Sequence, residues 1–159
     1  MKITILCVGK IKESFYRDAI GEYTKRLSKY CKIDIIEVAD EKTPDKASAA
    51  LEEQIKEKEA DRLLARLDES AYVYTLEIQG KRYSSRAFAG AINQAGINGC
   101  SHITFIIGGS LGLHEKVMKR SDQAISFSDM TFPHQLMRVI LCEQLYRAYR
   151  IISGEPYHK

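Results

Sequence analysis

The sequence predicts an α/β fold, with one domain over residues 1–159 and a parallel sheet that carries helices on both faces. Short apolar, β-branched segments alternate along the chain with amphipathic ones, an order typical of strands joined by crossover helices. The apolar segments also lack a clean alternation of apolar and polar residues, as expected for strands buried on both sides. A chain of 159 residues is long enough to bury one sizeable core.

Five segments are predicted strands because they are short and rich in Val, Ile, Thr, Tyr and Phe. Ligands of such sheets bind at the carboxyl ends of the strands. A binding site is therefore expected in the loops that follow the third, fourth and fifth strands, at 76–83, 108–112 and 127–132. The strands themselves are predicted at 3–9, 32–39, 71–78, 102–109 and 123–128.

Helices are predicted between these strands. The first is marked by apolar and aromatic residues spaced three or four apart, which share one helix face: Tyr16, Ile20, Tyr23, Leu27 and Tyr30.

The second predicted helix covers 44–67, starts at a proline and has a charged, solvated middle, "EEQIKEKEADR". Ser84 or Ser85 is expected to cap the third, which "GING" ends. A short helix is predicted at 113–120.

The last predicted helix, 133–152, has Pro133 in its first turn and apolar residues around most of its circumference. One small domain does not supply enough surface to cover such a helix, so a homodimer is expected. Arg138 falls on an apolar face with Cys142, Leu145 and Tyr149. A guanidinium there needs a carboxylate, backbone carbonyls or an anionic ligand, and both a structural ion pair and a ligand contact remain open.

Composition narrows the class of protein. The chain is 45% hydrophobic and 28% charged, which excludes disordered and collagen-like proteins, and its net charge of +3 permits a polyanionic partner. No segment approaches the length of a membrane span or reads as a signal peptide, so a cytoplasmic protein is expected. The four cysteines and four histidines show no metal-ligand spacing, so no metal is expected.

The glycine-rich stretch "GGSLG" at 108–112 lies between a predicted strand and a helix. It is neither the dinucleotide fingerprint nor a P-loop. It matches G-x-S-x-G, the nucleophile elbow of α/β-hydrolases, with Ser110 as nucleophile and Asp129 and His134 or His158 in the correct chain order. A serine hydrolase is therefore one alternative. Two others are a tight glycine turn and a surface on which a ligand lies flat against the backbone.

Three segments resemble the RlmH family: "TLEIQGK" (75–81), "FIIGGSLGL" (105–113) and the stretch from Ser126 to the C-terminus, with "TFPHQLMR", "EQLYRA" and "PYHK" as its most specific parts. The resemblance spans the whole chain. That family belongs to the SPOUT class and methylates N3 of a pseudouridine in 23S ribosomal RNA. The resemblance therefore implies a deep trefoil knot in the C-terminal part, a homodimer, and S-adenosylmethionine as methyl donor without a metal.

The resemblance also implies the site residues. Arg138 is an active-site residue that orients the donor or the RNA. In the C-terminal tail, Tyr157 stacks on a base, His158 accepts or relays the N3 proton and Lys159 contacts phosphate. The tail is too short to fold back onto its own site, but it can reach the site of a second subunit. The residues that line the donor pocket are Leu76, Gly108, Phe127, Ser128, Asp129, Met130, Thr131 and Phe132.

A further alternative is a non-enzymatic RNA-binding protein that uses the basic residues near the N-terminus. These are Lys10, Lys12, Arg17, Lys25, Arg26 and Lys29.

Overall fold

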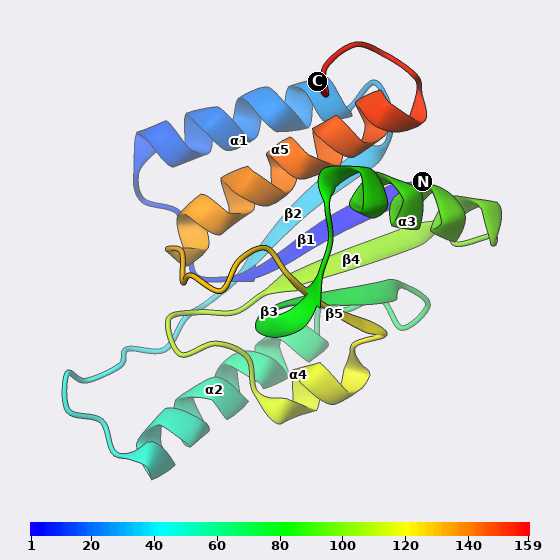
Figure 1. The fold of residues 1–159 in the computed structure, drawn as a ribbon. Coiled ribbons are helices and arrows are strands. Elements are labelled where there is room, and N and C mark those ends of the chain that lie inside the picture. The colour runs from blue at the N-terminus through cyan, green and yellow to red at the C-terminus, as the bar shows by residue number, and fades with distance from the viewer.

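A computed structural model describes residues 1–159, and its centre is a five-stranded sheet (Figure 1). Every neighbouring pair of strands is parallel, and the strand order is β2-β1-β4-β3-β5. The predicted α/β class with a parallel sheet is confirmed. The strands are β1 (Lys2–Val8), β2 (Lys32–Val38), β3 (Tyr72–Arg82), β4 (His102–Ile107) and β5 (Gln123–Ser126).

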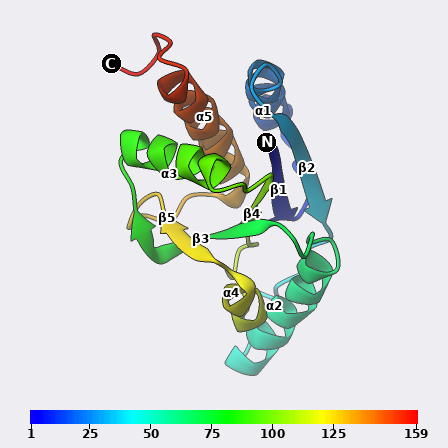
Figure 2. The ribbon, with the colours of Figure 1, turned by 90° about the vertical axis from the view of Figure 1, so that its right-hand side faces the viewer.

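Five helices cover the two faces of the sheet (Figure 2). On one face lie α1 (Ser14–Leu27), α3 (Ser85–Ile97) and α5 (His134–Ile152), with α5 between the other two. On the opposite face lie α2 (Ala49–Leu64) and α4 (Glu115–Arg120). None of the helices combines the length and apolarity that a bilayer crossing requires.

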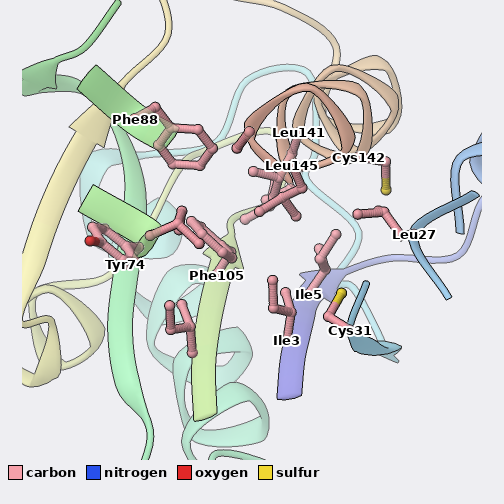
Figure 3. Close-up of a cluster of buried hydrophobic side chains, with 14 of the residues drawn as sticks. Ile3, Ile5, Leu27, Cys31, Tyr74, Phe88, Phe105, Leu141, Cys142 and Leu145 are labelled. Carbon is pink, nitrogen blue, oxygen red and sulfur yellow. The ribbon is translucent and has the colours of Figure 1, made fainter. Parts of the chain in front are cut away.

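The two faces carry cores of unequal size. The face under α1, α3 and α5 holds a cluster of 19 buried residues, in which the ring of Phe105 stacks on Tyr74 and lies near Phe88 (Figure 3). The face under α2 and α4 holds a cluster of 8. Alternate residues of β1 belong to different clusters, Ile5 to the larger and Leu6 to the smaller. The central strands are thus buried on both sides, as their sequences predict.

The start of α2 differs from the sequence prediction, whereas the cap of α3 agrees with it. α2 begins at Ala49 rather than Pro44, because Ser48 is the cap: its hydroxyl accepts the backbone N–H of Leu51. Pro44 instead begins a turn, which the N–H of Ala47 closes on its carbonyl. The Ser84 cap of α3 is confirmed by a hydrogen bond of 3.1 Å from the N–H of Ala87.

β3 is longer than predicted because it continues past an irregularity. Leu76 and Lys81 both pair with Ile125 of β5, so residues 77–80 form a bulge between them. Gly80 closes this bulge against the β5 backbone, where a Cβ on Gly80 would lie 2.5 Å from the carbonyl carbon of Ile125. Only glycine allows the two backbones to approach so closely. After the bulge β3 pairs with β5 again, and Arg82 lies opposite Ser126.

We predict that Gly80→Ala lowers the free energy of unfolding by about 1–3 kcal/mol, because the added methyl group must displace the β5 backbone. The control is Gly90→Ala in α3, where a Cβ meets nothing within 4 Å. That change should raise stability by about 0.5–1 kcal/mol. Urea denaturation followed by circular dichroism measures both. Equal stability of the two variants would contradict this view of the bulge.

Candidate active site

The carboxyl ends of β3, β4 and β5 meet around one cavity of about 310 Å³. This volume falls near the lower end of the range of small-molecule sites, about 300–1,000 Å³. Its walls come from three loops that are far apart in sequence, at 76–78, 107–113 and 125–132, and from the first turn of α5. These are the loops in which the sequence predicts a site.

A tight glycine turn forms one wall of the cavity. The N–H of Gly112 donates to the carbonyl of Gly109 over 3.1 Å, and a Cβ on Gly108 would lie 2.8 Å from the carbonyl carbon of Gly112. Gly108 is therefore required by the turn itself, which favours the tight-turn interpretation of "GGSLG". The closed turn presents its backbone to the cavity.

Glu59 of α2 supports the turn from behind. Its side chain is buried, and its Oε2 would lie 3.2 Å from a Cβ on Gly109. The other oxygen accepts the backbone N–H of Glu41 over 3.1 Å. Burial raises the pKa of this carboxyl above its ordinary value. The position of the turn thus depends on the packing of α2.

Two serines hold the 127–132 loop, Ser126 at the end of β5 and Ser128 within the loop. The hydroxyl of Ser126 donates to the carbonyl of Ser128, whose hydroxyl accepts the N–H of Met130 over 2.9 Å. Asp129 does not line the cavity, because its exposed side chain pairs with Arg82. The other residues expected around the donor do line it: Leu76, Gly108, Phe127, Ser128, Met130, Thr131 and Phe132.

Two residues of α5 that the sequence did not place around the donor also line the cavity, Met137 and His134, the latter named only as a possible partner of Ser110. They stand three residues apart in the first turn, directly after the 127–132 loop, and that spacing places both on the side of the helix facing the loop. Burial, and then the nearby charge of Arg138, lowers the pKa of His134. The lowered pKa favours the neutral form of this imidazole.

Arg138 is fully buried but does not line the cavity. Its guanidinium donates to Glu37 over 2.8 Å and to the carbonyls of Val8 and Gly9 over 2.7 and 2.8 Å. Arg138 thus has two of the three kinds of partner that the sequence left open, a carboxylate and backbone carbonyls. Arg138 fastens the first turns of α5 to the carboxyl ends of β1 and β2.

The C-terminal tail lies on the far half of α5 in its own chain and lines no part of the cavity (Figure 1). The hydroxyl of Tyr157 donates to Glu143 over 3.1 Å, and its ring meets Tyr146 edge-on and Arg147 face-on. Burial, and then the charge of Glu143, raises the pKa of Tyr157 to about 12. His158 lies 3.4 Å from Arg147. The fold of a single chain therefore does not bring the tail to the site.

The hydrolase alternative has no assembled triad. Ser110 and His134 both line the cavity, but no hydrogen bond joins them. Asp129 pairs with Arg82, and His158 contacts Arg147. No group of three or more His, Cys, Asp or Glu side chains that could hold a metal ion occurs in the structure.

We predict that Arg138→Lys lowers stability by about 1–3 kcal/mol for each backbone carbonyl that it leaves unpaired, because an ammonium cannot reproduce the planar fork. The control is Arg66→Lys, at an exposed arginine just after α2, which should change stability by about 0.5 kcal/mol or less. Denaturant midpoints compare the two variants, and an Arg138→Lys midpoint equal to that of the unaltered protein would refute the anchoring role.

Comparison with known proteins relates the chain to methyltransferases. The family model described as "Predicted SPOUT methyltransferase" matches residues 1–158. The chain is 59% identical to "Ribosomal RNA large subunit methyltransferase H" of Bifidobacterium adolescentis and 55% identical to the protein of that name in Clostridium beijerinckii. It is 60% identical to "Putative ribosomal RNA large subunit methyltransferase H" of Methanococcus maripaludis. Each alignment covers 100% of both chains.

A solved structure shares the fold. The chain superimposes on "a probable methylase family protein from Haemophilus influenzae" with a TM-score of 0.53, over 99% of this chain and 70% of the other. The sequence identity is 10%, so this likeness concerns the fold alone. The full-length matches to the family model and to relatives above 50% identity settle membership: the chain belongs to the SPOUT methyltransferase family, within the group named ribosomal RNA large subunit methyltransferase H.

Proposed function

We propose that this chain is an S-adenosylmethionine-dependent methyltransferase that modifies N3 of a pseudouridine in the 23S RNA of the large ribosomal subunit. The observation that carries the proposal is the cavity at the carboxyl ends of β3, β4 and β5, in a chain whose full-length relatives are named large-subunit ribosomal RNA methyltransferases. The enzyme acts in the cytoplasm on ribosomes. Its single domain, 1–159, contains a deep trefoil knot in the C-terminal part, an expectation that family membership supports.

The cavity suits S-adenosylmethionine. The adenine of the donor is flat and uncharged, and the cavity offers apolar side chains together with the backbone of the glycine turn and the 127–132 loop. No phosphate has to be held, so neither a P-loop nor a dinucleotide fingerprint is needed. The lowered pKa of His134 favours its neutral form, which does not repel a sulfonium. No metal takes part.

When bound, S-adenosylmethionine would supply a methyl group to the acceptor N3. N3 would give an electron pair to the methyl carbon as the carbon–sulfur bond breaks and its electrons go to sulfur, and N3 would lose its proton. The protein's contribution is position and proton transfer. Arg138 acts on position, because it fixes the first turns of α5, where His134 and Met137 line the cavity.

We propose that the active unit is a homodimer in which the tail of one subunit completes the cavity of the other. No residue of α5 is fully exposed, yet Leu136, Val139 and Ile140 are only half-buried and leave an apolar face for a second copy. In the complex Tyr157 stacks on a base, His158 takes the N3 proton and Lys159 contacts phosphate. The tail must then leave Glu143 and Tyr146 of its own chain.

The first test is calorimetric titration with S-adenosylmethionine. We predict that Gly108→Ala abolishes binding, because its methyl group would lie 2.8 Å from the backbone of Gly112 and the turn cannot close. Gly90→Ala, far from the cavity in α3, should bind as the unaltered protein does. If Gly108→Ala kept its affinity, the glycine turn would have no part in donor binding.

The second test removes Tyr157, His158 and Lys159. We predict that this truncation leaves donor affinity and the dimer mass unchanged while methylation of unmodified ribosomes collapses. His158→Ala alone should lower the single-turnover rate by about 10²–10⁴-fold if its imidazole is the base. Light scattering reports the dimer, with twice the 18.1 kDa chain mass expected. Methylation at the original rate by the truncated protein would exclude the tail from the reaction.

A further inference from the structure

A second cavity, of about 280 Å³, adjoins the donor cavity between α3 and α5. The two cavities share four wall residues, Ile125, Ser126, Phe127 and Phe132. We propose that this second cavity receives the acceptor base of the RNA, and that the basic residues after the β3 bulge hold the adjoining phosphates. The proposal rests on the proposed methyltransferase function and assigns the substrate side of the same site.

The bulge of β3 places the two cavities side by side. Leu76 before the bulge and Lys81 after it both pair with Ile125. Residues 76–78 line the donor cavity, whereas residues 83–85 line the second one. The end of β5 and the loop after it therefore belong to the walls of both cavities. Methyl transfer requires the acceptor atom to lie about 3–3.5 Å from the methyl carbon, so the acceptor must occupy a space that adjoins the donor.

The walls of the second cavity suit a flat base. Tyr83, Phe127 and Phe132 supply aromatic rings on which a base that has left its stack can lie. Polar groups stand beside them. The hydroxyl of Ser84 accepts a backbone N–H as the α3 cap and keeps its own hydrogen. The amide nitrogen of Gln144 donates to Glu143 and keeps its second hydrogen. Two donors are thus available for the ring carbonyls that flank N3 of a pseudouridine.

Three basic residues lie beside this cavity, in the segment "KRYSSR" at 81–86. Lys81 and Arg86 are exposed, and the ammonium of Lys81 lies 4.8 Å from the centre of the Tyr83 ring. Arg82 pairs with Asp129, which ties this segment to the 127–132 loop. Exposed cations around an aromatic cavity are what a single-stranded nucleotide requires, because phosphate binds the cations while the base stacks.

The first experiment compares Tyr83→Ala with Tyr83→Phe in methylation of ribosomes that lack the modification. We expect Tyr83→Ala to raise KM for ribosomes about 5- to 150-fold, the loss that one base–aromatic stack produces, and Tyr83→Phe to stay near the original value. Affinity for S-adenosylmethionine should not change in either variant, because Tyr83 does not line the donor cavity.

The second experiment compares Lys81→Gln with Lys58→Gln. Lys58 is an exposed lysine of α2 on the opposite face of the sheet. The slope of log K against log salt for binding to ribosomes should fall by about 0.7–0.9 for Lys81→Gln, as expected when one phosphate contact is lost, and should not change for Lys58→Gln.

Two results would overturn the proposal. One is an unchanged KM in Tyr83→Ala together with an unchanged salt slope in Lys81→Gln. The other is loss of the dimer in Tyr83→Ala by light scattering, which would show that the cavity seats a second copy of the chain instead of a base. Failure of the proposed methyltransferase function would give a different result from failure of this proposal. The unaltered protein itself would then neither bind S-adenosylmethionine nor methylate ribosomes.

Discussion

The placement of the site depends on one buried cation. A guanidinium withdrawn from water needs partners for its N–H groups. The two terminal nitrogens of Arg138 find them in Glu37 and in the carbonyls of Val8 and Gly9, at the carboxyl end of β1, whereas its Nε has none. Val8 is the last residue of β1, and Gly9 follows it. The same contacts fix the entry of α5 over the sheet. Since His134 and Met137 belong to that first stretch of helix, a wall of the donor cavity is set by an interaction outside it.

The sequence predicted the parts of the fold that follow from local pattern. β1 and β4 are short and mostly apolar or β-branched, and both are buried on both faces. The Ser84 cap follows from the preference of serine for the position before a helix. The bulge of β3 escaped prediction because "EIQGKR" is polar and reads as a loop. Its return to the sheet depends on contact between Gly80 and Ile125, 45 positions later. Contacts across such separations leave no periodic signal.

The candidate site, like the fold, could be predicted from the sequence only in part. The rule that ligands bind at the carboxyl ends of parallel strands located the loops, and the family resemblance supplied the donor and the RNA. The direction of single side chains could not be predicted. Asp129 lies in the expected loop yet turns to Arg82, because a partner from β3 happens to be within reach. Tyr157 settles on Tyr146 and Glu143, a pairing that only the folded path of the tail creates.

The unequal size of the two cores determines which helices unfold locally at the lower cost in free energy. α2 and α4 rest on 8 buried residues, whereas the opposite helices share 19, so partial unfolding that frees α2 and α4 requires the loss of far less apolar contact. Amide hydrogens of these two helices should exchange with solvent through such openings while the other face stays protected. Glu59 belongs to α2 and packs against Gly109 of the glycine turn. When α2 unfolds locally, the turn therefore loses this contact. A ligand that needs the closed turn would therefore slow exchange in a helix that it never touches.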